Sequence, residues 1–202
     1  MSAAREDAGL GPGALLAAYA AGCFPMDEPG ARGPVALYEA DPRAVLPVEG
    51  FRVPRSVARA RRRAGYEIRV DGAFREVAQA CAAGRTGVWL TPRLIDAYER
   101  LHRFGHAHSI EAWRDGRLCG GLFGVALGGL FTSESMFHRE SDAGSVALAG
   151  AGDLVREGGF LLWDIQMASP HTARFGAEEI GRDEYRRRLR RALAVDARLP
   201  DA

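Results

Sequence analysis

The chain has 202 residues, of which 47% are hydrophobic and 26% are charged, a composition that is typical of a folded globular protein and excludes a disordered or collagen-like chain. Its net charge of +1 hides an uneven distribution, because residues 1–41 have a net charge of −4 and residues 43–63 have a net charge of +6. All 27 basic residues are arginine, which genome base composition explains equally well, but such a concentrated arginine segment is suited to bind phosphates.

The elements predicted for the N-terminal half are mostly helical. In chain order they are a short apolar helix at residues 13–21, an arginine-rich helix at 54–64, a strand at 66–70, and helices at 73–83 and 91–104. Thr91 followed by Pro92 is typical of a helix start, because threonine caps free backbone N–H groups and proline suits the first helical turn. A Gly/Pro-rich stretch at 29–34 follows the first helix. We therefore assign residues 1–40 to a small N-terminal subdomain.

Extended structure dominates after residue 105. The predicted elements are strands at 109–113, 118–126 and 130–133, a helix at 142–157, a strand at 160–167, and a helix at 182–193. Asp115-Gly116 is a hairpin-turn sequence, so the first three strands are expected to form an antiparallel meander. The mostly apolar segment 160–167 indicates a strand that is buried on both faces. This order predicts an α+β fold, with a central antiparallel or mixed sheet in a larger domain of residues 41–202.

The cysteines and the apolar segments indicate the cellular compartment in which the protein is expected to reside. Cys23, Cys81 and Cys119 are far apart and odd in number, which favours neither a disulfide framework nor a zinc ribbon. No stretch reaches the roughly 18 apolar residues of a membrane span, and the N-terminus has no apolar signal-peptide core. We predict a cytoplasmic protein that does not bind a membrane.

Two polar residues stand out in the buried strand. Asp164 and Gln166 are two positions apart, so their side chains are expected to lie on the same face of the strand. An ionisable carboxylate in such a strand is costly unless it is paired or used. Asp164 either hydrogen-bonds loop backbone for purely structural reasons, or it binds the Gln166 side-chain amide and makes its carbonyl oxygen a better proton acceptor.

The segment after the third strand of the meander offers a second candidate group. Glu134 is either a solvated turn residue or part of an anionic cluster with Asp164 that suits a cationic substrate. Met136 and Phe137 are able to supply an adaptable apolar pocket beside it.

The other candidate side chains have a purely structural explanation as well as a functional one. Trp89 is either a core residue or a platform on which a nucleobase stacks. The arginine run at 59–63 is either a solvated helix face or a phosphate-binding surface. The histidines near residues 102–108 are separated by a predicted helix end and have no ligand set around them, so we expect no metal. Ser135 and Ser169 lack the setting of a catalytic serine.

Several of these segments carry a resemblance to a known family. The agreeing stretches are LLAAY and GCFP near the N-terminus, DPRAVL at 41–46, GVWLTP at 87–92, AYERLHRFGHAHSIEAW at 97–113, GGLFGVALGGLF at 120–131, ESMF at 134–137, DIQ at 164–166 and SPHTARFGAEEI at 169–180. In this order they resemble the leucyl/phenylalanyl-tRNA–protein transferases, and the match runs from about Leu15 to Leu189.

The resemblance implies both a fold and a reaction. It implies an aminoacyltransferase that moves Leu or Phe from aminoacyl-tRNA to an N-terminal Arg or Lys of an acceptor protein, which marks that protein for degradation. The larger domain is then expected to have a GNAT-like acyltransferase fold. Residues 138–146 lack the Gly-rich pyrophosphate loop of acyl-CoA enzymes, which favours an RNA-borne donor. No cofactor, metal or DNA partner is implied.

The resemblance also implies roles for individual residues. Asp164, Gln166 and Glu134 are the expected catalytic group, in which Asp164 polarises Gln166 and Glu134 holds the cationic acceptor. The remaining assignments are Met136, Ser135, Trp163 and Leu122 in the aminoacyl pocket, Trp89 and Met26 at the terminal adenine, and Arg55, Arg59, Arg61, Arg62 and Arg63 on the acceptor stem.

The chain departs from the family pattern at several positions. These are Met26, Leu37 and Tyr38 in place of tryptophans, Ser133 in place of glycine, His138 in place of serine, Ser145 in place of lysine, and Arg174 in place of the serine of an SLGA motif. Two alternatives therefore stay open: a GNAT-like N-acyltransferase with a changed donor or acceptor, and a non-catalytic module that binds tRNA or degradation signals.

Overall fold

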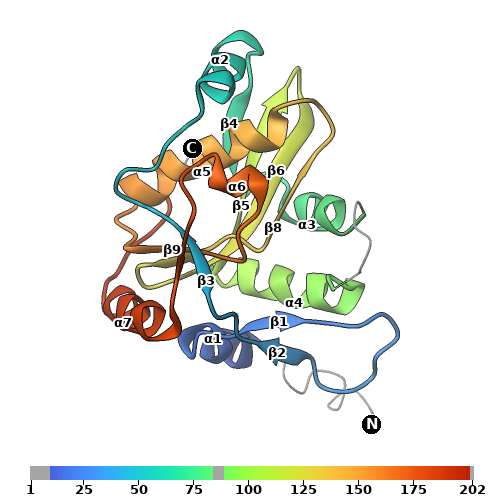
Figure 1. Ribbon diagram of the computed structural model, residues 1–202. Helices are drawn as coiled ribbons and strands as arrows, with labels where there is room; N and C mark the ends of the chain where they lie inside the picture. Colours follow the sequence, from blue (N-terminus) through green and yellow to red (C-terminus); the bar gives the residue numbers. More distant parts are fainter. Residues whose placement is uncertain (1–9, 84–88, 201–202) are drawn as a thin grey trace.

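The computed structural model describes residues 10–83 and 89–200, and Figure 1 shows their arrangement. In chain order they form α1 (Pro12–Ala20), β1 (Phe24–Met26), β2 (Ala36–Tyr38), β3 (Arg43–Leu46), α2 (Arg55–Arg63), β4 (Glu67–Val70), α3 (Phe74–Ala83), α4 (Pro92–Arg103), β5 (Ala107–Arg114), β6 (Arg117–Leu127), β7 (Leu130–Thr132), β8 (Ser135–His138), α5 (Ala143–Glu157), β9 (Leu162–Gln166), α6 (Pro170–Ala173), β10 (Glu178–Ile180) and α7 (Arg182–Leu193).

The helices and strands predicted from caps and periodicity are present, with ends shifted by no more than two residues. Gly84, which follows the predicted end of α3, lies outside the described residues. Among the described residues, the elements that were not predicted have only three or four residues each, namely β1, β2, β3, β8, α6 and β10. Elements this short contain too few residues to display a period, and the five strands among them depend on partner strands for their formation.

The main sheet is mixed but mostly antiparallel, as predicted. Its order is β10-β3-β9-β7-β6-β5-β4, and β8 pairs with β6 beside β7. The β5–β6 hairpin turns at Asp115 and Gly116, which both have positive φ, and the β7–β9 pair is parallel. All five residues of β9 are buried, which confirms the prediction of a strand covered on both faces.

Helices cover both faces of this sheet, and alternate residues of β6 face the two layers. Phe123 and Val125 pack into a core with residues of α1, α3 and α4. Leu122 and Ala126 face the opposite way and pack with residues of α5. In Figure 1, α5 accordingly lies across one face of the sheet and α3 and α4 lie on the other. The result is an α+β fold with two hydrophobic layers.

The long strand β6 is shared by two partners along one edge. Its residues 126–127 pair with β7, and its residues 120–123 pair with β8. Gly124 lies where the partner changes, and a Cβ atom at this position would be 1.8 Å from the carbonyl oxygen of Thr132. Only glycine permits this close approach, which brings the end of β7 across the strand.

The N-terminal segment contributes its own small sheet and also joins the main core. Strands β1 and β2 pair only with each other among the described residues. Leu15 and Tyr19 of α1 are buried in the same core as Leu94 and Tyr98 of α4. The division into residues 1–40 and 41–202 stays a prediction.

Helix α4 supplies a first test of the sequence interpretation. Thr91 caps α4 by accepting a hydrogen bond from the Leu94 N–H, and its hydroxyl donates to the Asp27 carboxylate. We expect Thr91→Ala to lower the free energy of unfolding by about 1–2 kcal/mol, because a buried N–H and a buried carboxylate each lose a partner. Thr91→Ser retains the hydroxyl and is the control. Chemical denaturation in which both variants lose equal stability would contradict this role.

Candidate active site

Two neighbouring strands separate at one point of the sheet and open a cavity between them. The Ser133 N–H still bonds to the Asp164 carbonyl of β9 at 2.8 Å, whereas the Glu134 N–H bonds back to Phe123 of β6 at 2.9 Å. Beyond this point β8 pairs with β6 alone, while β9 continues beside β3. The resulting cavity has a volume of about 720 Å³ and is lined from β1, β6, β8, α5, α6 and the end of β9.

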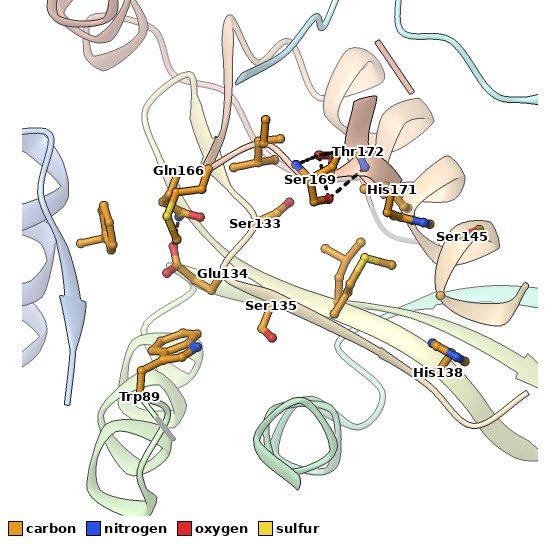
Figure 2. A pocket seen from close by; sticks show the side chains of 18 of the residues that line it. Trp89, Ser133, Glu134, Ser135, His138, Ser145, Gln166, Ser169, His171 and Thr172 are labelled. Carbon is orange, nitrogen blue, oxygen red and sulfur yellow. Dashed lines mark hydrogen bonds between the residues drawn. The ribbon is translucent and has the colours of Figure 1, made fainter. Parts of the chain in front are cut away.

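Most of the predicted site residues line this cavity. Figure 2 shows Glu134 and Gln166 on the same side as Trp89, and Ser135 nearer the middle. The other predicted residues in its lining are Met26, Leu122 and Met136. Segments that are far apart in the sequence therefore meet around one space.

Glu134 is one of the acidic residues that line the cavity. Its carboxylate accepts hydrogen bonds from the Thr132 hydroxyl at 2.6 Å, the Gln166 amide at 3.1 Å and the Tyr98 hydroxyl at 3.2 Å. Burial raises the pKa of Glu134 from 4.5 to about 7, and the negative charge of nearby Asp164 adds to the rise. Near neutral pH this carboxyl is therefore able both to hold and to release a proton.

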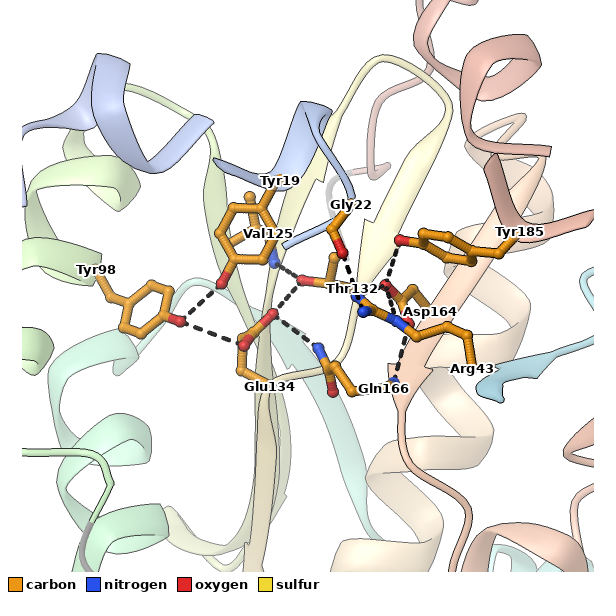
Figure 3. Close-up of polar contacts among 10 residues, drawn as sticks. All are labelled: Tyr19, Gly22, Arg43, Tyr98, Val125, Thr132, Glu134, Asp164, Gln166 and Tyr185. Carbon is orange, nitrogen blue, oxygen red and sulfur yellow. Dashed lines mark hydrogen bonds and ion pairs between the residues drawn. The ribbon is translucent and has the colours of Figure 1, made fainter. Parts of the chain in front are cut away.

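Gln166 has a strained backbone that aims its side chain at Glu134. Its φ is 57°, in the left-handed region, and its N–H donates to Asp164 Oδ1 at 2.9 Å. The side-chain Nε2 donates to Glu134 rather than to Asp164, so the predicted bond between the Asp164 carboxylate and the Gln166 side chain is wrong. Since Asp164 holds the backbone of Gln166, the amide group is free to meet the second carboxylate (Figure 3).

Asp164 is committed to a buried ion pair and does not line the cavity. Arg43 of β3 donates to it from Nε at 2.9 Å and from Nη2 at 2.6 Å, and the Tyr185 hydroxyl donates at 2.8 Å. The guanidinium also donates to the Gly22 carbonyl at 3.0 Å and lies between the rings of Phe24 and Tyr185. Figure 3 shows this group beside, but distinct from, the Glu134–Gln166 pair.

Trp163 also lies outside the cavity lining, contrary to its predicted place in the pocket. The side chain is fully buried and packs against the rings of Phe51 and Phe131. Its indole Nε1 donates to the Ser133 hydroxyl at 2.8 Å. Because β9 is covered on both faces, the position before Asp164 points into the core under α5 rather than into the split between the strands.

The arginines of α2 form an exposed basic face away from the cavity lining. Arg61 pairs with Asp153 at 2.7 Å, but Arg55, Arg59, Arg62 and Arg63 have no carboxylate in ion-pair range within the part of the chain that the structure describes. Most other arginines, such as Arg186 and Arg188, are paired. Among the described residues, α2 therefore carries four arginines without an ion pair, and Arg190 and Arg191 of α7 are also unpaired.

Sequence reasoning missed several residues that the structure brings to the site. His138, Ser145 and His171 line the cavity, and Arg43 holds Asp164 from a distance of 121 residues. Arg43 and His171 lie in DPRAVL and SPHTARFGAEEI, two of the segments that carry the family resemblance, and this could have pointed to them. No local pattern, however, indicated which residues their side chains contact.

Residues 10–83 and 89–200 contain neither a cluster of potential metal ligands nor a helix that could span a membrane. These residues contain no group of three or more His, Cys, Asp or Glu side chains placed to hold a metal ion. None of their helices combines the length and the apolar character needed to cross a bilayer.

Comparisons with known proteins give one consistent result. A sequence profile of the family described as leucyl/phenylalanyl-tRNA protein transferase matches residues 45–190. Proteins named leucyl/phenylalanyl-tRNA–protein transferase from Herpetosiphon aurantiacus and Rubrobacter xylanophilus are each 48% identical, over 93% of this chain and 97% of theirs. One of the same name from Thiobacillus denitrificans is 50% identical, over 87% of this chain and 77% of its own. A solved structure titled L-PGS from Bacillus licheniformis overlaps 66% of this chain and 47% of its own with a TM-score of 0.47 and 11% identity.

Proposed function

Since the chain belongs to the leucyl/phenylalanyl-tRNA–protein transferase family, we propose that the cavity between β8 and β9 is where its aminoacyl transfer takes place. The enzyme moves Leu or Phe from aminoacyl-tRNA to the N-terminus of a protein. The observation that carries the proposal is the Glu134–Gln166 pair, which joins a carboxyl of pKa about 7 to an oriented amide inside the cavity.

The donor and acceptor need different parts of this cavity. Leu122 and Met136 give the cavity an apolar surface that suits a Leu or Phe side chain, and Trp89 supports stacking of the terminal adenine. Met26, also in the lining, replaces the aromatic ring expected opposite it. The acceptor amine is then placed at Glu134 and Gln166, where the carboxylate attracts a cationic N-terminal Arg or Lys.

The proposed chemistry uses the reactivity of the donor ester. The α-amine nitrogen attacks the ester carbonyl carbon, the new amide bond forms, and the ester bond to the ribose breaks. A terminal amine has a pKa of about 7.7–8.0, so the enzyme needs mainly to align it and to accept a proton. The Gln166 carbonyl oxygen orients the amine, and Glu134 takes the proton that the nitrogen loses and passes it to the ribose oxygen as that oxygen leaves.

Asp164 has a positioning role in this proposal. Its carboxylate is saturated by Arg43, Tyr185 and the Gln166 N–H, so it keeps Gln166 in its left-handed conformation. The amide carbonyl thereby stays available to the substrate while its NH₂ group bonds to Glu134.

The fold and setting follow as further parts of the proposal. We infer a GNAT-like domain from the family resemblance, supported by the order of an antiparallel meander, the helix α5 and the buried strand β9 parallel to β7. The reaction is placed in the cytoplasm, where charged tRNA is available.

A transfer assay tests the proposal directly. Radiolabelled leucyl-tRNA and phenylalanyl-tRNA are incubated with peptides that begin with Arg, Lys or Ala, and labelled peptide is measured. We expect transfer to the Arg and Lys peptides in the wild type and its loss in Gln166→Ala. Transfer that is undiminished in Gln166→Ala would refute the site, and equal transfer to the Ala peptide would refute the acceptor assignment.

The basic face of α2 leads to a prediction about salt. We propose that Arg55, Arg59 and Arg62 contact phosphates of the tRNA, because they carry unpaired charge on an exposed helix. Replacing Arg59 and Arg62 by Ser is expected to weaken tRNA binding and to reduce the slope of log K against log salt by about 1 for each lost phosphate contact. Binding titrations at several salt concentrations measure this slope. Arg190→Ser on α7 is the matched control, and an equal effect of that variant would contradict a site on α2.

A further inference from the structure

We propose that His138, His171 and Arg174 form a phosphate-binding rim that receives the single-stranded 3′ end of the donor tRNA on its way into the cavity. This inference rests on the proposed function of the cavity and deepens it, because the donor ester reaches Glu134 and Gln166 only if the nucleotides before it cross the cavity wall.

The first observation is that two of these basic side chains, His138 and His171, line one end of the cavity, while Arg174 follows α6 outside the lining. His138 ends β8, His171 is in α6, and both line the cavity together with Ser145 of α5. Figure 2 shows these three residues on the side away from Trp89. An RNA end that crosses this rim therefore approaches the adenine platform from the opposite side of the cavity.

The second observation concerns the electrostatics of the rim. Burial lowers the pKa of His171, and electrostatic interactions with Arg174 and His138 lower it further. The negative charge of an arriving phosphate acts in the opposite direction and favours a proton on His171. A carboxylate also lies here, that of Asp142, the residue before α5, so the rim has charges of both signs.

The third observation is an unsatisfied polar atom. The Nε2 atom of His171 is buried and has no hydrogen-bond partner within the described part of the chain. A buried nitrogen without a partner costs about 1–3 kcal/mol, a cost that a ligand oxygen at this position removes. An imidazole N–H that gains a phosphate oxygen forms a charge-assisted hydrogen bond, which is stronger than a neutral one.

The fourth observation links the rim to the basic face of α2. Arg174 follows α6, and its Nη2 donates to the Ser56 hydroxyl in the first turn of α2 at 3.1 Å. Positive charge therefore continues from α2 through Arg174 to the cavity. A polynucleotide has one phosphate per nucleotide, so a chain that leaves α2 meets a positive group before it reaches the ester site.

The departures from the family pattern converge on this same rim. Ser145 replaces a lysine, whereas His138 and Arg174 replace serines. One cationic side chain is lost and two basic side chains are gained within a single region of the structure.

Two donors that differ in phosphate content test this proposal. The first is 3′-phenylalanyl-adenosine, which has no phosphodiester, and the second is the phenylalanyl ester of the trinucleotide CpCpA, which has two. Transfer of Phe to an Arg peptide is measured with the wild type, with the double variant His138→Ser/Arg174→Ser, and with Arg191→Ser on α7 as the control. The preference for the trinucleotide is the ratio of the two kcat/KM values.

We expect the double variant to lose about tenfold of this preference and the control to keep it, because each phosphate contact is made only by the longer donor. Both replaced residues are exposed, so thermal denaturation should confirm that the variant folds. An unchanged ratio in the double variant, or an equal loss in Arg191→Ser, would overturn the phosphate rim. A wild type that transfers Phe from neither donor nor from charged tRNA would instead overturn the proposed function, and this inference with it.

Discussion

Replacing Glu134 by glutamine is expected to slow aminoacyl transfer about 100-fold at pH 8, the usual lower range for loss of a general base. The wild-type rate should rise with pH through about 7, because burial raises the pKa of the Glu134 carboxyl to about 7 and only its ionised form accepts a proton. It should rise further near pH 8, where the acceptor amine loses its own proton. Glu134→Gln should lack the rise near pH 7 and keep only the later one. Single-turnover transfer at saturating charged tRNA, measured from pH 6 to pH 8.5, records both effects.

The same variant separates catalysis from stability. The folded-state pKa of Glu134 exceeds its ordinary value of 4.5, so the stabilisation from this carboxyl is complete below pH 4.5 and is lost as the pH rises through about 7. Glu134→Gln has no such group and should lose less stability than the wild type over this range. A variant that is folded at pH 8 but slow is the expected result.

A second glutamate, outside the cavity, serves as the control for the effect of Glu134→Gln on the rate. Glu178 is exposed on β10 and pairs with Arg188, away from the cavity lining. Glu178→Gln should keep the wild-type rate and pH profile. If Glu134→Gln also kept the rise near pH 7, a different group would be the proton acceptor.

Loss of the buried ion pair between Arg43 and Asp164 should lower the free energy of unfolding far more than loss of an exposed pair. We expect Arg43→Met to lower the free energy of unfolding by about 3–5 kcal/mol, because it leaves the Asp164 carboxylate buried without its counter-ion. The exposed pair of Arg61 and Asp153 is the comparison, since Arg61→Met should cost only about 0–1 kcal/mol. Urea denaturation at pH 7.5 measures both.

The double variant Arg43→Met/Asp164→Leu refines this test. It removes both charges, so it should recover part of the stability lost in Arg43→Met. It also removes the acceptor of the Gln166 N–H, so its transfer rate should stay low although the protein folds. A loss in Arg43→Met no greater than that in Arg61→Met, or full activity in the double variant, would contradict the positioning role of this pair.

The secondary structure of this protein was largely readable from the sequence because its signals are local. Thr91 and Pro92 mark the start of α4, Asp115-Gly116 marks a hairpin, and the apolar run 160–167 indicates a strand that is covered on both faces. Each of these signals depends on residues within a few positions of one another. The same holds for the segments that carry the family resemblance, which are contiguous stretches of sequence.

The placement of Glu134 and Gln166 at strand ends was also accessible from the sequence, but their bonding was not. The hydrogen bond from the Gln166 amide to Glu134 connects residues 32 positions apart, and the bond between Arg43 and Asp164 connects residues 121 apart. Their formation depends on β3 lying beside β9 and on β8 leaving β9 after Ser133.

The burial of Trp163 likewise depended on the topology of the sheet. Trp163 and Asp164 are neighbours in β9, so their side chains point to opposite faces of the sheet. If one face of β9 were exposed, one of these side chains would lie near solvent. Because β9 is buried on both faces, both side chains are buried. The longer elements, the family and the residue types at the strand ends could thus be recognised from contiguous stretches of sequence. Which carboxylate binds the glutamine, and which histidines line the cavity, depended on the tertiary structure, because those pairings arise only when distant strands adopt one register.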